Sequence, residues 1–200
     1  MESRRTPGQR AGLTRADVLV AARRLLAERG LDALTMRALA RALDVAPNTL
    51  YSHVASKAAL IDDVLDDVLA EVEVPDPAAE DPMVGLRALM VSTYDVLLAH
   101  SDLVPLYLAR QGARGRNAQR LGDLMLRQLA GAGVRGAEAR EAQRVLIVFT
   151  IGFAAFATHP PIDADAGALV PGDELRGNFE SGLRWLLAGI ATPTARPRPR

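Results

Sequence analysis

The side chains best placed to do chemistry in this sequence are the hydrogen-bonding groups that follow Pro47. Proline is tolerated in the first turn of a helix, so the spacing predicts a short helix over residues 47–53. Its exposed face would carry Tyr51 as an amphipathic contact, together with polar groups at Asn48, Thr49, Ser52 and His53. Such groups hydrogen-bond base edges and phosphates. The chemistry indicated is therefore recognition of nucleic acid.

A catalytic role finds no support in the remaining residue types. The histidines His53, His100 and His159 lie far apart in the sequence, and there is no Glu-x-x-His pair or Gly-rich phosphate loop. Cysteine is absent, which excludes disulfides, thiolate metal sites and thiol nucleophiles. We expect no enzyme, no metal site and no cofactor.

Two short helices joined by a tight turn would position the polar face. Thr35 can cap the first helix, whose narrow buried stripe is formed by Met36, Leu39, Ala40 and Leu43. Asp44, Val45 and Ala46 would form the turn before Pro47. This pattern predicts a helix-turn-helix whose second helix enters the major groove of DNA. An ordinary helical hairpin fits the same periodicity.

One further helix is expected on each side of this pair. Thr14, with Asp17 three residues later, resembles a capping box for a helix that Gly30 ends. Ser56 is a suitable cap for a later helix whose wide apolar face runs to Val72. The opposite face of that helix is acidic, and we interpret it as solvated, at Asp62, Asp63, Asp66 and Asp67.

Composition and charge agree with a helical, DNA-binding chain. The 200 residues are 49% hydrophobic with few aromatic residues, and Ala, Leu and Arg recur, so we expect an almost all-α fold. Net charge is zero, but residues 1–60 carry ten Lys and Arg against five Asp and Glu, whereas residues 61–90 carry one against nine. Because phosphate binding depends on local charge, the basic N-terminal part remains suited to DNA.

Membrane and secretory segments are not expected. No apolar run approaches the roughly 20 residues of a membrane-spanning helix, and the first ten residues lack the apolar stretch of a signal peptide. We therefore expect a cytoplasmic protein with no membrane partner.

Breaks in composition predict four segments. Residues 1–12, with three arginines at Arg4, Arg5 and Arg10, would be a flexible basic arm, and 13–74 the helix-turn-helix domain with its connecting helix. A second domain would cover 83–191, followed by a disordered tail at 192–200. The second domain contains apolar helical stretches at about 83–99, 102–111, 117–131, 137–157 and 173–190.

Four sequence blocks resemble the N-terminal domain of the tetracycline-repressor (TetR) family. They are Leu34-Thr35-Met36-Arg37-Ala38-Leu39-Ala40, Leu43-Asp44-Val45, Thr49-Leu50-Tyr51-Ser52-His53-Val54 and Lys57-Ala58-Ala59-Leu60. The sequence departs from the family in two places. Asp44 stands where the turn commonly has Gly, and Pro47-Asn48 is not a typical base-reading pair, so an operator sequence does not transfer.

The resemblance implies that eight residues contact DNA: Thr35, Arg37, Pro47, Asn48, Thr49, Tyr51, His53 and Lys57. Thr49 and Tyr51 would contact phosphates. Lys57 and the backbone amides at the N-terminus of its helix would bind one phosphate jointly. Arg37 would reach a base, and the base-facing positions of the second helix would be Pro47, Asn48 and His53. Two alternatives stay open, because Tyr51 also suits a core position and both His53 and Lys57 suit a solvated surface.

The resemblance also implies that the second domain binds a ligand and forms a dimer. The helices over 137–157 and 173–190 would pair with their mates in a four-helix interface, although an intramolecular core explains the same apolar residues. An apolar pocket with two phenols would be lined by Met90, Tyr94, Leu97, Tyr107, Met125, Phe149 and Phe153. Ordinary core packing explains these side chains too. His100 and Arg110 would suit an anionic or metal-chelating ligand.

Together these features predict a TetR-family transcriptional repressor. It would bind a pseudopalindromic operator as a homodimer and be released by an unknown small molecule. One alternative is a regulator or activator without an inducer. Another is a helical-bundle enzyme or small-molecule carrier whose N-terminal motif is vestigial.

Overall fold

The first helix begins at a cap that the sequence supplies. In the computed structural model, which describes residues 12–74, 81–158 and 171–192, helix α1 covers Arg15–Ala33. Thr14 Oγ1 accepts from the Asp17 amide at 3.2 Å, and the Asp17 carboxylate accepts from the Thr14 amide at 2.9 Å. The predicted capping box is therefore present. Gly30 leaves the helical region at φ 73°, where the helix was expected to end, and one further turn follows it.

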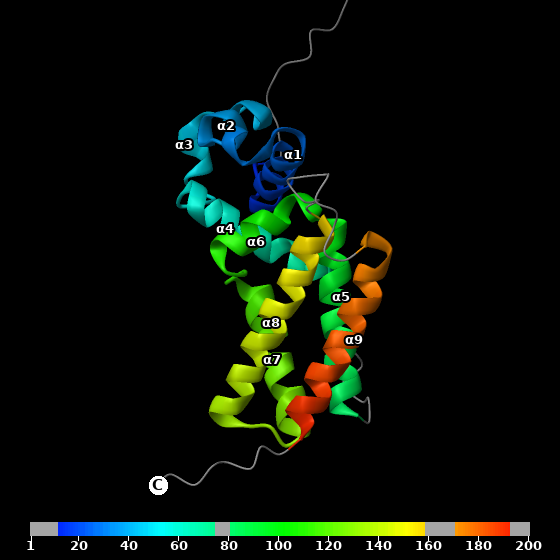
Figure 1. Ribbon diagram of the computed structural model, residues 1–200. Helices are drawn as coiled ribbons and strands as arrows, with labels where there is room; N and C mark the ends of the chain where they lie inside the picture. Colours follow the sequence, from blue (N-terminus) through cyan, green and yellow to red (C-terminus); the bar gives the residue numbers. More distant parts are fainter. Residues whose placement is uncertain (1–11, 75–80, 159–170, 193–200) are drawn as a thin grey trace, which may run out of the picture. The chain divides into compact units, whose positions relative to one another are not determined.

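The next two helices form the predicted pair. Helix α2 covers Met36–Leu43 and α3 covers Pro47–Leu50 (Figure 1). Thr35 Oγ1 accepts from the Ala38 amide at 3.0 Å and so caps α2. The third helix ends at Leu50 and not at His53 as expected, because the next residues form a turn in which the His53 amide donates to the Leu50 carbonyl at 2.9 Å.

Helix α4 (Lys57–Val68) begins with Ser56 Oγ accepting from the Ala59 amide at 3.1 Å, as expected of a cap. A short 3₁₀ turn, η1 (Leu69–Glu71), follows it. The chain divides into two compact units after Val64, so the division falls inside α4. The sequence had suggested a domain boundary between residues 74 and 83, where composition changes. Composition does not show that the last turn of a helix packs with the elements that follow it.

Each unit has its own apolar core. In the first unit the fully buried side chains come from all four helices and the α1–α2 link, and include Val18, Ala22, Leu34, Leu39, Leu50 and Val64. Burial of each larger aliphatic side chain is worth roughly 1.5–3 kcal/mol. These contacts hold three short helices that would not be stable alone.

The second unit is a bundle of helices that follows α4. The long helices of this bundle lie side by side in Figure 1. Its elements are α5 (Pro82–Ala99), η2 (Ser101–Leu103), α6 (Val104–Arg110), α7 (Arg116–Gly131), α8 (Gly136–Thr158) and α9 (Gly172–Ala191). Helix α8 packs against α5, α6, α7 and α9. The described residues contain helices and no strand, so the all-α prediction is confirmed. The arm at 1–11, most of the long break at 158–172 and the tail from 193 lie outside the described residues.

An aromatic cluster joins three of these helices. The rings of Tyr94 on α5 and Phe179 on α9 stack with centroids 4.1 Å apart. Phe149 and Phe153 on α8 lie 5.5 and 5.7 Å from Phe179. Burial raises the pKa of Tyr94 above its ordinary value. Such aromatic pairs contribute about 0.5–1.5 kcal/mol beyond the area they bury.

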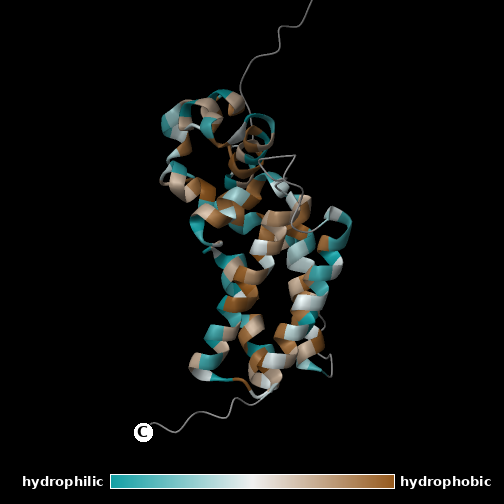
Figure 2. Ribbon diagram, in the orientation of Figure 1, coloured by the Kyte–Doolittle hydropathy of each residue, from teal (hydrophilic) through white to brown (hydrophobic). Residues whose placement is uncertain are grey.

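Two helices are long and apolar enough to cross a membrane by length and composition alone, namely α5 and α8. The sequence itself contains no continuous apolar run of that length, because charged and polar residues interrupt both helices. Both helices pack on other helices of the second unit, and Figure 2 shows hydrophilic residues interspersed along them. Both helices belong to the bundle of the second unit.

Asp66, near the end of α4, caps another helix of the second unit. The N-cap residue of α7 is Gly115, which has no side chain to accept the first amides. The Asp66 carboxylate accepts from the amides of Asn117 and Ala118 at 3.1 and 2.9 Å. A negative charge at a helix N-terminus is favoured by the helix dipole as well.

The packing around this cap is close. A Cβ added to Gly115 would lie 2.2 Å from Asp66 Cγ, so glycine is required there by contact. Asp66 is only 9% exposed. The interpretation of the whole acidic face of α4 as solvated is therefore wrong for Asp66, because a helical wheel does not show which later helix will start beside it.

Replacing Asp66 by Ala is expected to lower the free energy of unfolding of the second unit by about 1–3 kcal/mol, because two part-buried amides of α7 lose their acceptor. Urea denaturation followed by circular dichroism measures the change. Asp123→Ala, at an exposed position on α7, is the control and should change it by about 0.5 kcal/mol or less. An equal loss in both variants would contradict the capping role.

Candidate nucleic-acid interface and small-molecule cavity

The exposed surface of α3 is created by one buried side chain. Leu50 is fully buried, so its neighbours in the same short helix, Pro47, Asn48 and Thr49, face outward and are exposed. Tyr51 is 53% exposed, which rules out the alternative that it is a core residue. The structure thus presents an amide, a hydroxyl and a phenol on one small surface, and all three can donate hydrogen bonds.

Helix α2 adds two exposed groups near its first turn. The Thr35 oxygen already accepts from the Ala38 amide, so its hydroxyl proton remains available to donate to an anion. Arg37 is exposed two residues later. A guanidinium offers five donors in a planar fork that matches a phosphate or a guanine edge.

Lys57 is held in place at the start of α4. Its ammonium donates to the Leu31 carbonyl at 3.2 Å, and the side chain is half-buried. An ammonium has three donors, so this bond leaves capacity for an anion. Lys57 is therefore more ordered than the solvated surface charge that the sequence also allowed.

His53 lies in the turn after α3 and is half-buried. The pKa of Asp17 is lowered, chiefly by its hydrogen bonds to Thr14 and to a smaller degree by the charge of His53. The imidazole is therefore electrostatically linked to the start of α1. It lies four residues before Lys57 in the chain.

The turn between α2 and α3 depends on an unusual backbone conformation. Asp44 adopts the left-handed region, with φ 53° and ψ 49°. Its amide donates to the Arg41 carbonyl at 3.2 Å, and the Val45 amide donates to the Ala40 carbonyl at 3.0 Å. The family commonly has Gly at this position, and Gly adopts the left-handed region readily, so the sequence indicated this conformation. Aspartate tolerates it better than most residues.

The second unit contains a cavity of about 230 Å³ lined by α5, α6, α7 and α8. Of the side chains expected to line a pocket, Met90, Leu97, Tyr107 and Met125 are at its wall. Tyr94, Phe149 and Phe153 are not, because they pack in the aromatic cluster with Phe179. Spacing placed all seven on apolar helix faces, but it did not show which faces leave a space between them.

Four polar residues of the cavity wall were not identified from the sequence. They are Thr93 on α5, Gln111 directly after α6, and the pair Gln143 and Thr150 on α8. A spacing of seven residues puts Gln143 and Thr150 on one face of the helix, two turns apart. Polar side chains on an otherwise apolar helix face were the signal that could have identified them.

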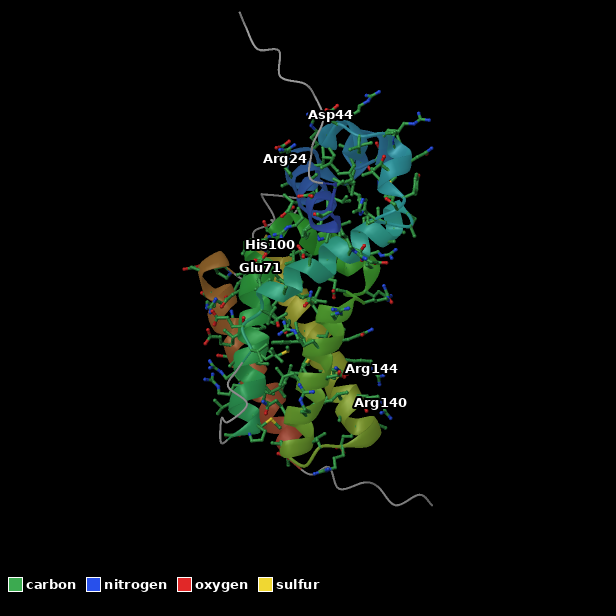
Figure 3. The ribbon with its side chains drawn as sticks, turned by 180° about the vertical axis from the view of Figure 1, so that it is seen from behind. Arg24, Asp44, Glu71, His100, Arg140 and Arg144 are labelled. Carbon is green, nitrogen blue, oxygen red and sulfur yellow. The ribbon has the colours of Figure 1, made fainter. Side chains whose placement is uncertain are left out.

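His100 and Arg110 do not line the cavity. His100 Nε2 lies 2.7 Å from a carboxylate oxygen of Glu71, and Figure 3 shows the two side chains together. Within the described ranges no group of three or more His, Asp or Glu residues could hold a metal ion. The expected anionic or metal-chelating ligand therefore finds no support at His100.

Large apolar side chains remain exposed on α8 and α9. Val148, Phe156 and Trp185 are 70%, 63% and 72% exposed. Val145 and Ile147 on α8 are partly exposed as well. Large apolar side chains that remain this exposed are candidates for a protein interface.

The exposed recognition surface and the helical unit with its cavity define a helix-turn-helix, DNA-binding transcriptional regulator. Residues 18–64 match the family model described as bacterial regulatory proteins, tetR family. The class A tetracycline repressor from Escherichia coli transposon 1721 is 34% identical over 158 residues, which are 75% of this chain and 68% of that protein. The chain belongs to the tetR family.

Two solved structures show the same fold over almost the whole chain. ActR of Streptomyces coelicolor, solved with actinorhodin, has a TM-score of 0.77 at 27% identity and covers 90% of this chain and 96% of its own. BioQ, solved with its double-stranded DNA operator, has a TM-score of 0.70 at 28% identity, with 91% and 100% covered. The predicted fold class and regulatory role are thereby confirmed, and so is the expectation that the protein is not an enzyme.

Replacing Asp44 by Ala is expected to lower the free energy of unfolding by about 1 kcal/mol, because alanine is strained in the left-handed region. Asp44→Gly removes that strain and should be at least as stable as the parent or within about 0.5 kcal/mol of it. Thermal denaturation followed by circular dichroism distinguishes the two. Asp32→Ala, an exposed aspartate at the end of α1, is the control, and a glycine variant as unstable as the alanine variant would contradict the backbone argument.

Proposed function

We propose that this regulator is a repressor that binds a pseudopalindromic operator as a homodimer and is released when a small molecule enters the cavity of the second unit. The observation that carries the proposal is the exposed surface of α3 and the following turn, held outward by the buried Leu50. Two similar proteins support it by what they were solved with: BioQ with operator DNA and ActR with actinorhodin. The cytoplasm, where such DNA lies, is the proposed location.

The proposed contacts divide into two groups. Phosphates are held by Thr35, Thr49, Tyr51 and Lys57, whose hydroxyl, phenol and ammonium groups donate without reading the base sequence. Base edges are read by Arg37, Asn48 and His53, with Pro47 in apolar contact. The first group sets the position of the protein on the duplex, and the second sets its preference among sequences.

The proposed dimer uses the exposed apolar side chains of α8 and α9. Pairing these helices with those of a second copy would bury Val148, Phe156 and Trp185 in a four-helix interface. A two-fold axis then presents two α3 helices to DNA. Dimers of this class bind half-sites about one helical turn apart, roughly 34–36 Å.

Release by a ligand requires that the ligand bind one conformation of the dimer more tightly than the other. Helix α4 begins in the first unit and ends in the second, where the hydroxyl of Tyr107 donates to the Leu65 carbonyl. Tyr107 also lines the cavity. A change in the cavity wall can therefore act directly on the end of the helix that leads to the DNA-binding unit.

The double variant Tyr51→Ala with Lys57→Ala is expected to weaken operator binding at least about tenfold and to lower the salt dependence by about one counterion, because a cationic phosphate contact is lost. Fluorescence anisotropy over a series of salt concentrations, with a DNA fragment selected by the parent protein, measures both. Arg140→Ala, a basic residue on α8 labelled in Figure 3, is the control. Unimpaired specific binding by the double variant would contradict the proposed interface.

Trp185 is the single tryptophan of the sequence and reports on the dimer. Its emission is expected to shift to longer wavelength on dilution, because an indole that is 72% exposed in one chain becomes buried in the pair. Val148→Lys should give monomers in sedimentation velocity, whereas Leu108→Lys, at another exposed apolar position on α6, should not. A concentration-independent monomer with full operator affinity would contradict the dimer.

A further inference from the structure

We propose that the cavity of the second unit selects an uncharged, compact and mainly apolar molecule that carries a hydrogen-bond acceptor, and that the hydroxyl of Thr150 recognises this acceptor. The inference rests on the proposed function, since it names the chemical class of the ligand for the same cavity. Three features of the wall carry it: the absence of charge, the state of its polar groups and its size.

The wall offers nothing to compensate a charged ligand. Among the described residues that form it, none is Asp, Glu, Lys, Arg or His, and most are aliphatic, Met or Gly. Removing an ion from water into such a site costs far more than removing a neutral polar group, unless a counter-charge is present. A carboxylate or an ammonium ion is therefore disfavoured, and a neutral molecule is accepted.

Thr150 is a buried polar residue of the wall whose hydroxyl has only a weak acceptor. It is 1% exposed, and the hydrogen bond of its hydroxyl is to the sulfur of Met90, at 3.7 Å. Thioether sulfur is a weak acceptor. Two other helix threonines behave differently, because the hydroxyls of Thr93 and Thr158 donate to the carbonyls of Leu89 and Ala154 at 2.8 Å.

The hydroxyl of Thr150 could likewise donate to a carbonyl of its own helix. It donates instead to Met90, another residue of the cavity wall. A ligand carbonyl or ether oxygen is a stronger acceptor than sulfur, so it would take this proton at little cost. The buried hydroxyl of Thr150 therefore favours ligands that offer a stronger acceptor than sulfur at this point of the wall.

The side chains of Tyr107 and Gln143 in the wall already donate to backbone carbonyls, and Gln111 lies at an exposed position. The hydroxyl of Tyr107 donates to the Leu65 carbonyl, so this residue offers mainly its ring to the cavity. Gln143 Nε2 donates to the Gly122 carbonyl at 3.0 Å, which fixes the amide at the wall. A ligand with one acceptor near Thr150 therefore fits better than one with many polar groups.

The size of the cavity limits the ligand further. About 230 Å³ is below the roughly 300–1,000 Å³ of sites that enclose drug-sized ligands. A rigid bicyclic molecule with little polar surface is the right scale. Extended or highly substituted ligands would have to displace wall residues.

Four probes of matched shape test the proposal by calorimetric titration of the full-length protein. They are α-tetralone, which is neutral with one acceptor, tetralin, which has none, the tetralin carboxylate, an anion, and aminotetralin, a cation at neutral pH. We expect α-tetralone to bind about two- to tenfold more tightly than tetralin, the gain of one hydrogen bond. Both ions should bind at least about tenfold more weakly than α-tetralone.

Variants assign the effect to the residue. Thr150→Val keeps the shape but removes the hydroxyl, so it should reduce α-tetralone affinity to that of tetralin while leaving tetralin affinity within about twofold. Thr150→Ser keeps the hydroxyl and should retain the preference. Ala118→Leu, which fills part of the cavity, should abolish binding of both neutral probes, and circular dichroism checks that each variant is folded.

The outcomes separate this inference from the proposed function. Tighter binding of either ion, no binding of any probe, or an unchanged preference in Thr150→Val would overturn the ligand class. Operator release by α-tetralone is measured in parallel by fluorescence anisotropy. If α-tetralone shows the expected preference but does not release DNA, the ligand class stands and release by the cavity ligand is wrong.

Discussion

The buried carboxylate of Asp66 is the interaction on which the organisation of the second unit depends. It stands on the last turns of α4 and supplies the acceptor that the start of α7 lacks, because the N-cap residue there is Gly115. Ala118, whose amide donates to Asp66, also lines the cavity. The end of α4 and the cavity wall are therefore joined by direct hydrogen bonds. Helix α4 thus starts at Lys57 in the first unit and ends among the elements that enclose the cavity.

The DNA-binding surface follows a different physical rule, in which burial of apolar residues exposes polar ones. The helix α3 has a single turn and presents Asn48 and Thr49 only because Leu50 is held in the core. The left-handed backbone of Asp44 sets the direction in which α3 leaves α2. Lys57 is restrained by the Leu31 carbonyl before any DNA is present. Folding therefore already orders these groups, which lowers the conformational entropy that they would lose on binding.

The predictability of the two regions differs for a physical reason. The caps at Thr14, Thr35 and Ser56 act within four residues of chain, so the sequence pattern showed them directly. The cavity depends on side chains that are distant in the chain. Tyr94 and Met90 stand one turn apart on α5, yet the first stacks on Phe179 and the second lines the cavity. Helical spacing identifies a face, but it does not say what stands opposite that face.

The sequence by itself determined the helical fold class, the local caps at Thr14, Thr35 and Ser56, the turn at Asp44 and the family, because these follow from local propensity and from ordered motifs. Tertiary structure decided that Asp66 is buried as a cap, that Phe149 and Phe153 pack in the aromatic cluster with Phe179, and that Thr150 lines a cavity with a weak hydrogen-bond partner. These outcomes depend on which helices pack together and on how closely. Packing is a property of several segments at once, and no single segment encodes it.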